Sequence, residues 1–340
     1  MSVGQVIICG VRRGGELIGN EEFQQFAGRA GRKSGGSGLI TILCPEEDEA
    51  EAWGIAESDI PEVHSRMDSI EEIAFHILPR IHCGFTEDDY LLWWKRTLAS
   101  TQGGKNPGWD AINGFLQESE CIDENRSITS VGKLSVAMYI RPTQASEIIS
   151  RARQSKEVRG WKNDSAHILS PEIISYISAP IWHGQSAFVR GGFPEEPLSL
   201  WRRIRFSAGL EDSEYDETAC LCWMLFQNGE DESPFDDGYV VPKDFLFLLK
   251  TMRENAERMF SVVGMAISLA GFKDASSELG IWRTAVDSKT TYEIARTMME
   301  LSVSKNIAKK LHSIGIFSLQ DYESRKTEAE EFLSEQTDSD

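Results

Sequence analysis

The stretch Gln25-Phe26-Ala27-Gly28-Arg29-Ala30-Gly31-Arg32 decides how this chain is interpreted, because it places two arginines beside two glycines in the form Q-x-x-G-R-A-G-R. A guanidinium stabilises the charge that develops on a phosphoryl group during its transfer. Gly28 and Gly31 would let the end of a helix approach a nucleotide closely. The alternative is a solvated basic helix that runs into a Gly- and Ser-rich segment. The residue types alone fit either a helix end that meets a phosphoryl group or a solvated basic helix.

The flanks of this stretch predict a small α/β unit. Residues 5–10 and 39–44 are β-branched runs that end at Gly10 and before Pro45, as buried parallel strands do. With a helix between them they form a β-α-β arrangement. Gly14 and Gly15 lie between two short strand-like arms and predict a tight hairpin. The remainder of the chain is mainly helical in pattern, so we expect a mainly α protein with a small α/β part.

The eight-residue stretch resembles motif VI of the superfamily-two helicases, and the order of segments resembles the Ski-type members, closest to the archaeal repair helicases. In that family this helix lies at the edge of the second RecA-like motor domain. The resemblance implies that Arg29 and Arg32 are catalytic and that Gln25, Gly28 and Gly31 contact ATP. It also implies that residues 1–66 are the C-terminal part of that motor domain. The hairpin would be a duplex-splitting wedge in the family; an ordinary connecting loop is the alternative.

A complete motor also needs a phosphate-binding loop and a carboxylate pair for Mg²⁺. The sequence contains neither G-x-x-x-x-G-K-[ST] nor a DExH-like box. We therefore expect no ATP hydrolysis by this chain alone. ATP and Mg²⁺ are expected only with a partner chain, a helicase motor subunit that supplies both elements.

Residues 67–150 resemble the winged-helix module that follows the motors in this family. Helical periodicity begins at Ile70, and Thr86 is placed to cap the next helix with Asp89 at the capping-box position. The module of this family contains a T-x-L-G-r segment followed by a helix that ends in Y-I-x-P. The counterparts here are Thr-Ser-Val-Gly-Lys at residues 129–133 and Tyr-Ile-Arg-Pro at residues 139–142. Such a module either binds DNA directly or braces the motor against the helical bundle, and the few cations here favour bracing.

Residues 151–295 resemble the ratchet bundle of these helicases. The pattern predicts one long helix over residues 244–271, with an apolar stripe that Arg253 and Arg258 interrupt on other faces. In the family this helix touches the translocating single strand of DNA or RNA, which requires stacking and phosphate contacts. Arg258 is the first choice for such a contact. The alternative is a core helix with a solvated polar face.

Residues 296–325 resemble the helix-hairpin-helix that closes the archaeal enzymes, with Lys305 and Lys309 placed to bind phosphate. The family has G-x-G at the turn, whereas this chain has Ser302-Val303-Ser304, so a packing role is the alternative. Residues 326–340 are acidic and are expected to form a disordered tail.

The formal net charge of −19 weighs against a free-standing nucleic-acid binder, so any strand path should follow the local basic groups. These lie at Arg12 and Arg13, residues 151–153, residues 202–205 and residues 305–310. No apolar run approaches the length of a membrane span, which predicts a cytoplasmic protein without membrane contact. The histidines and six cysteines lack metal-binding spacings, and the cysteines are expected to be reduced core thiols.

These observations combine into one expectation: the chain is the C-terminal subunit of a split superfamily-two helicase. A motor subunit would provide the rest of the ATP site, and single-stranded DNA or RNA would pass along the bundle. The alternative is a non-catalytic scaffold derived from a helicase, which acts through protein contacts and retains a vestigial motif VI.

Overall fold

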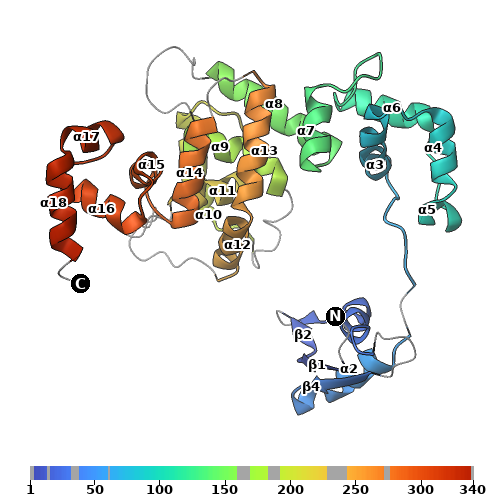
Figure 1. Cartoon of the computed structure of the whole chain (residues 1–340). Coiled ribbons are helices and arrows are strands. Elements are labelled where there is room, and N and C mark those ends of the chain that lie inside the picture. The colour runs from blue at the N-terminus through green and yellow to red at the C-terminus, as the bar shows by residue number, and fades with distance from the viewer. Residues whose placement is uncertain are drawn as a thin grey trace. The chain divides into compact units, whose positions relative to one another are not determined.

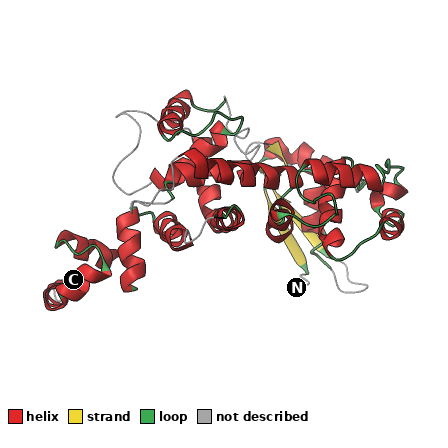
Figure 2. Ribbon diagram, turned by 90° about the horizontal axis from the view of Figure 1, so that it is seen from above, coloured by secondary structure: helices red, strands yellow, loops and turns green. Residues whose placement is uncertain are grey.

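The chain folds into two units, Met1–Arg66 and Met67–Asp340, each built around its own buried core (Figure 1). The computed structural model describes residues 4–13, 16–31, 38–59, 62–158, 169–182, 192–227, 243–271 and 276–337. Helices form nearly all of the second unit, and the strands of the described residues lie in the first (Figure 2). The expected class, mainly α with a small α/β part, is confirmed.

The first unit contains the β-α-β arrangement that its sequence predicts. Strand β1 pairs in parallel with β4, and helix α1 lies between them in the chain. Strands β2 and β3 pair antiparallel on either side of Gly14 and Gly15, which themselves lie outside the described residues. The elements are β1 Gln5–Cys9, β2 Arg12–Arg13, β3 Glu16–Leu17, α1 Asn20–Ala27, β4 Leu39–Leu43, η1 Glu46–Asp48 and α2 Glu49–Glu57.

The second unit begins with five helices and one β-bridge. Thr86 and Asp89 form the expected capping box at the start of α4, each accepting a hydrogen bond from the backbone of the other. A single antiparallel bridge joins Ile122 to Ile128. The helices are α3 Ile70–His82, α4 Glu87–Trp94, α5 Leu98–Thr101, α6 Trp109–Glu118 and α7 Ser130–Met138.

Gly132 fixes how α7 meets this bridge. A Cβ atom at Gly132 would lie 2.1 Å from the carbonyl oxygen of Cys121, a distance that no side chain tolerates. Thr129 caps the helix by accepting a hydrogen bond from the N–H of Gly132. The glycine is therefore required for the close approach of α7 to the preceding backbone.

A helical bundle follows, and its core is continuous with that of the preceding helices. Helix α13 packs against α7, α8, α9 and α14. The elements are α8 Pro142–Val158, α9 Pro171–Ser178, η2 Ala179–Trp182, α10 Glu195–Ser207, α11 Asp216–Gln227, α12 Lys243–Glu254, α13 Ala256–Leu269 and α14 Ser276–Ser288.

The prediction of one long helix over residues 244–271 is wrong, because the helix breaks at Asn255. The backbone of Asn255 has φ −108° and ψ 11°, outside the helical region. Its side-chain Nδ2 donates a hydrogen bond of 2.8 Å to the carbonyl of Thr251. An asparagine that bonds to nearby backbone competes with the helical ladder. Helices α12 and α13 therefore replace the single helix.

Four helices close the chain: α15 Tyr292–Leu301, α16 Lys305–Ser313, α17 Leu319–Ser324 and α18 Lys326–Thr337. The last of these corrects the expectation of a disordered tail for residues 326–337, while residues 338–340 lie outside the described residues. Ala329 is fully buried against Leu311 and Ile316, with Leu333 packed beside them. Arg325 is held by both carboxylate oxygens of Glu328, at 2.8 and 2.6 Å. A short apolar stripe thus holds the acidic segment against α16 as a helix.

The cysteines match their expectation only in part. All six are free thiols, and Cys121, Cys220 and Cys222 are buried in the bundle. Burial raises the pKa of the Cys121 thiol to about 11. Cys9 and Cys83 are instead exposed, so the expectation of core thiols is wrong for them.

Candidate nucleotide and nucleic-acid sites

The motif VI-like segment ends helix α1. Gln25 lies exposed in the last turn, and Gly28 caps the helix by donating its N–H to the carbonyl of Gln24. Arg29 follows directly and is exposed. Gly31 has φ +67°, a left-handed conformation that glycine adopts without strain. Arg32 lies outside the described residues.

Strand β1 has one edge that no described strand covers. Its bonds to β4 include Leu39 N–H to the carbonyl of Gly4 at 3.0 Å and Gly10 N–H to the carbonyl of Leu43 at 2.7 Å. Backbone groups alternate along a strand, so the even-numbered residues of β1 bond to β4. The odd-numbered residues, centred on Ile7, therefore direct their N–H and C=O groups to the other edge. Within the described residues the sheet ends there.

One face of this sheet is covered and the other is open. Ile8 and Ile42 of β4 face the core with Phe23 of α1. On the opposite face, Ile7, Leu39 and Leu43 are 55%, 59% and 56% exposed. Parallel sheets are normally covered on both faces, because their strands are apolar on both sides. The described residues thus supply neither a further strand beside this two-stranded parallel sheet nor a layer over its apolar face.

Arg29 lies at a groove of about 340 Å³ along this open edge. The backbone of residues 6–10 forms one wall, while Ile18, Glu22 and Phe26 contribute to the other. Among the described residues, no side chain forms a hydrogen bond or an ion pair with the Arg29 guanidinium. Its charge is available to an anion that approaches the edge of β1.

Arg12 lines the same groove but is already engaged. Its Nε donates to Asp48 Oδ1 at 2.8 Å, and its Nη2 lies 3.6 Å from Glu51 Oε1. Hydrogen bonding and the charge of Asp48 raise the pKa of this guanidinium. Arg12 therefore ties the β2–β3 hairpin to the segment before α2. The side chain of Arg13 lies outside the described residues.

The structure separates the two arginines predicted on the ratchet helix. Arg253 lies in the last turn of α12, partly buried, and its Nε and Nη2 atoms have no hydrogen-bond partner among the described residues. Burial lowers the pKa of this guanidinium. Arg258 lies beyond the break, in the first turn of α13, and is exposed. Only Arg258 presents its charge at the surface.

Arg258 reaches across to the turn that follows α7. Its Nη2 donates a hydrogen bond of 3.3 Å to the carbonyl oxygen of Tyr139. Tyr139 is 66% exposed and has φ 51° and ψ 55°, a left-handed conformation that is uncommon for a bulky residue. Its ring meets that of Phe75 edge-on, with 4.6 Å between the centroids. The structure thus brings two aromatic rings to the predicted strand contact.

The sequence did not identify Tyr139 or Phe75 as functional residues. One signal was present: Tyr139 follows the last turn of a predicted helix, where the left-handed cap is usually glycine or asparagine. A bulky residue in this strained conformation indicates a role beyond ending the helix.

Lys305 and Lys309 do not form an open phosphate site. Nζ of Lys305 donates hydrogen bonds of 3.0 Å to the carbonyls of Ser288 and Lys289, at the end of α14. Lys309 is partly buried on α16. Ser302 has φ 54° and ψ 41°, a left-handed conformation that glycine adopts without strain. These contacts favour packing over phosphate binding at this hairpin.

Two other basic groups are also occupied. Arg151 is 2% exposed, and its Nε donates to Glu147 Oε1 at 2.7 Å. Arg205 is buried and lies 3.1 Å from Asp216 and 2.8 Å from Asp212. These two arginines therefore form contacts within the bundle, and a nucleic-acid path along residues 151–153 and 202–205 stays a prediction.

Across the described ranges, no cluster of His, Cys, Asp and Glu side chains has the composition and spacing to hold a metal ion. Nor does any helix in those ranges have the length and apolar character needed to cross a bilayer. Comparison of the sequence with models of protein families and with curated proteins finds no match to either.

Proposed function

We propose that this chain is the C-terminal subunit of a split superfamily-two nucleic-acid helicase or translocase. It would complete the ATP site of a partner motor chain and guide single-stranded nucleic acid along its bundle. The proposal is carried by one observation: Arg29 lies beside the open edge of a parallel sheet that lacks neighbouring strands. If a motor chain added a strand at this edge, the nucleotide bound to the motor chain would lie within reach of Arg29.

The open edge supports a strand as the occupant. Extended segments bind to exposed sheet edges through main-chain hydrogen bonds, and apolar residues on the open face add affinity. Ile7, Leu39 and Leu43 provide that apolar face. Arg29 would then stabilise charge on the transferring phosphoryl group. ATP would supply that phosphoryl group. Carboxylates of the partner would hold the Mg²⁺ ion, whose charge would offset that of the phosphates.

The second unit would brace the motor and contact the strand. Residues 67–150 fit the role of a winged helix that packs on the bundle, because α7 contacts both α8 and α13. Residues 151–295 would supply the strand contact at Arg258. Residues 296–325 would act as a packed helix-hairpin-helix, since Lys305 caps α14.

The alternative proposal is a helicase-derived scaffold without catalytic function. The inward-directed Lys305 and the pairing of Arg12, Arg151 and Arg205 with carboxylates favour it, because these cations are not available to phosphate. The acidic net charge fits protein contacts better than nucleic-acid contacts.

An ATPase assay separates the two proposals. The tagged chain would be purified with its partners from the cells that naturally produce it, and hydrolysis measured with and without single-stranded oligonucleotide. We expect turnover that the oligonucleotide stimulates in the complex, and none for the chain purified alone. Hydrolysis by the chain alone would contradict the proposal, and a complex without any ATPase activity would support the scaffold.

A further inference from the structure

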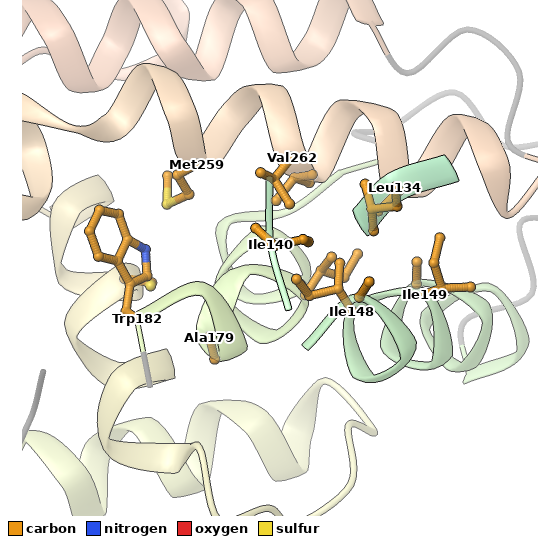
Figure 3. Packing of buried hydrophobic residues seen from close by; sticks show 14 of the residues in the cluster. Leu134, Ile140, Ile148, Ile149, Ala179, Trp182, Met259 and Val262 are labelled. Carbon is orange, nitrogen blue, oxygen red and sulfur yellow. The ribbon is translucent and has the colours of Figure 1, made fainter. Parts of the chain in front are cut away.

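The turn after α7 fixes the Tyr139 backbone while leaving its ring in solvent. Both Tyr139 and Ile140 donate their backbone N–H groups to the carbonyl of Ser135, as in a helix C-terminal cap. Ser135 Oγ in turn donates a hydrogen bond of 2.7 Å to the carbonyl of Ile140. Ile140 inserts into the buried cluster that includes Val262 and Ile148 (Figure 3). The anchored backbone holds Tyr139 in a left-handed conformation.

The side chain of Tyr139 is not part of the core. Glycine would satisfy the cap at lower conformational cost, because a left-handed residue with a Cβ is strained. The tyrosine ring remains 66% exposed and touches Phe75 by its edge, which leaves a ring face open. Backbone strain of this kind gathers at functional sites.

A cation contacts the backbone of Tyr139. Arg258 is held by its bond to the Tyr139 carbonyl, and no carboxylate of the described residues forms an ion pair with it. The nearby acids are engaged elsewhere: Glu257 pairs with Arg283 at 3.0 Å, and Glu72 pairs with Arg141. Two carboxylates that lie close in sequence to Phe75 and Arg258 are thus paired with other cations.

We propose that Tyr139, supported by Phe75 and Arg258, is a stacking platform for a base of single-stranded nucleic acid. A base would lie on the open face of the Tyr139 ring, and the Arg258 guanidinium would contact the adjoining phosphate. Aromatic rings stack on any base, and arginine adds charge and cation–π contacts. The inference deepens the proposed function, on which it rests, by naming the residue that contacts the strand.

Fluorescence anisotropy of the full chain with labelled oligodeoxythymidine and oligouridine tests the platform. Loss of one stacked base should weaken binding about tenfold in Tyr139→Ala, since such stacking is worth about 1–3 kcal/mol. Tyr139→Phe keeps the ring and should bind within about twofold of wild type. Tyr139→Gly should also bind weakly but should unfold at a higher temperature, because it relieves the left-handed strain. The two oligonucleotides distinguish DNA from RNA.

Phe206→Ala is the matched control. Phe206 is an aromatic residue 82% exposed on α10, next to Arg202 and Arg203 in the helix. Its loss should leave binding unchanged. The platform is overturned if Tyr139→Ala binds like wild type, if Phe206→Ala loses as much affinity, or if the wild-type chain binds neither oligonucleotide. ATP turnover of the purified complex, measured in parallel, reports separately on the proposed function.

Discussion

The guanidinium carbon of Arg151 lies 4.3 Å from the ring centroid of Tyr176, and Nη1 of the same arginine donates a 3.0 Å hydrogen bond to the Tyr176 carbonyl. Tyr215 approaches the same guanidinium at 4.8 Å. One buried charge thus links α8, α9 and the segment before α11. Burial raises the pKa of the Tyr215 hydroxyl to about 12.

Arg151→Ala should destabilise the second unit by roughly 3 kcal/mol, because it removes a buried side chain with its two ring contacts and leaves the Tyr176 carbonyl without its donor. Urea unfolding followed by circular dichroism measures the loss. Arg153→Ala, two residues along the same helix, removes only an exposed contact with Glu120 and should change little. If both variants lost the same free energy of unfolding, Arg151 would not be the residue that links α8, α9 and the segment before α11.

Acid should weaken the C-terminal helices through His312. Burial lowers the pKa of its imidazole below the ordinary 6.5, and Nε2 lies 2.8 Å from Thr297 Oγ1. The unfolded chain then binds the proton more readily than the folded one, so the contribution of this group is complete above about pH 6.5 and is lost as pH falls through the lowered value.

The thermal midpoint should therefore fall between pH 7.5 and pH 5, and less steeply in His312→Gln. His82→Gln, which alters an exposed ring, should retain the wild-type dependence. If His312→Gln follows the wild-type profile, the histidine is not the responsible group.

Ser302→Gly should stabilise the hairpin between α15 and α16 by about 0.5 kcal/mol. The gain from relieving the left-handed conformation exceeds the greater entropy of glycine in the unfolded chain. Slower amide hydrogen exchange in α15 and α16 is the expected result. Faster exchange would mean that the Ser302 side chain stabilises the turn in a way that its geometry does not reveal.

Ile7→Pro should impair assembly without unfolding the first unit. The N–H of Ile7 points to the open edge of β1, whereas that of Ile8 is directed to β4. Ile8→Pro should disrupt the sheet in the isolated chain. Co-purification with the motor chain, beside circular dichroism of both variants, tests the difference. Normal assembly of Ile7→Pro would exclude strand addition at this edge.

The sequence predicted the elements that local patterns determine. The β-branched runs around Ile7 and Ile40 form the parallel pair, and Thr86 caps its helix. The break at Asn255 was missed because a side-chain bond to the backbone outweighs a continuous apolar stripe. Helix α18 was missed because the acidic composition concealed the pair Ala329 and Leu333.

The sites were harder to predict because they depend on contacts between distant residues. The sequence alone suggests that Arg151 is an exposed cation. The rings that cover it belong to Tyr176 and Tyr215, which lie 25 and 64 positions further along the chain. The sequence likewise suggests that Lys305 is a phosphate ligand, whereas in the structure it donates a hydrogen bond to a carbonyl at the end of α14. Tyr139 becomes notable only when its backbone conformation and its exposure are known together.

ATP turnover of the complex carrying Arg29→Ala tests the central claim most directly. An arginine that meets charge in the transition state affects kcat, so turnover at saturating ATP should fall by about 10³-fold while assembly and strand binding persist. Arg66→Ala, an exposed arginine of the same unit, should retain wild-type turnover. Unchanged turnover in Arg29→Ala would contradict the account and favour a scaffold that acts through its partners.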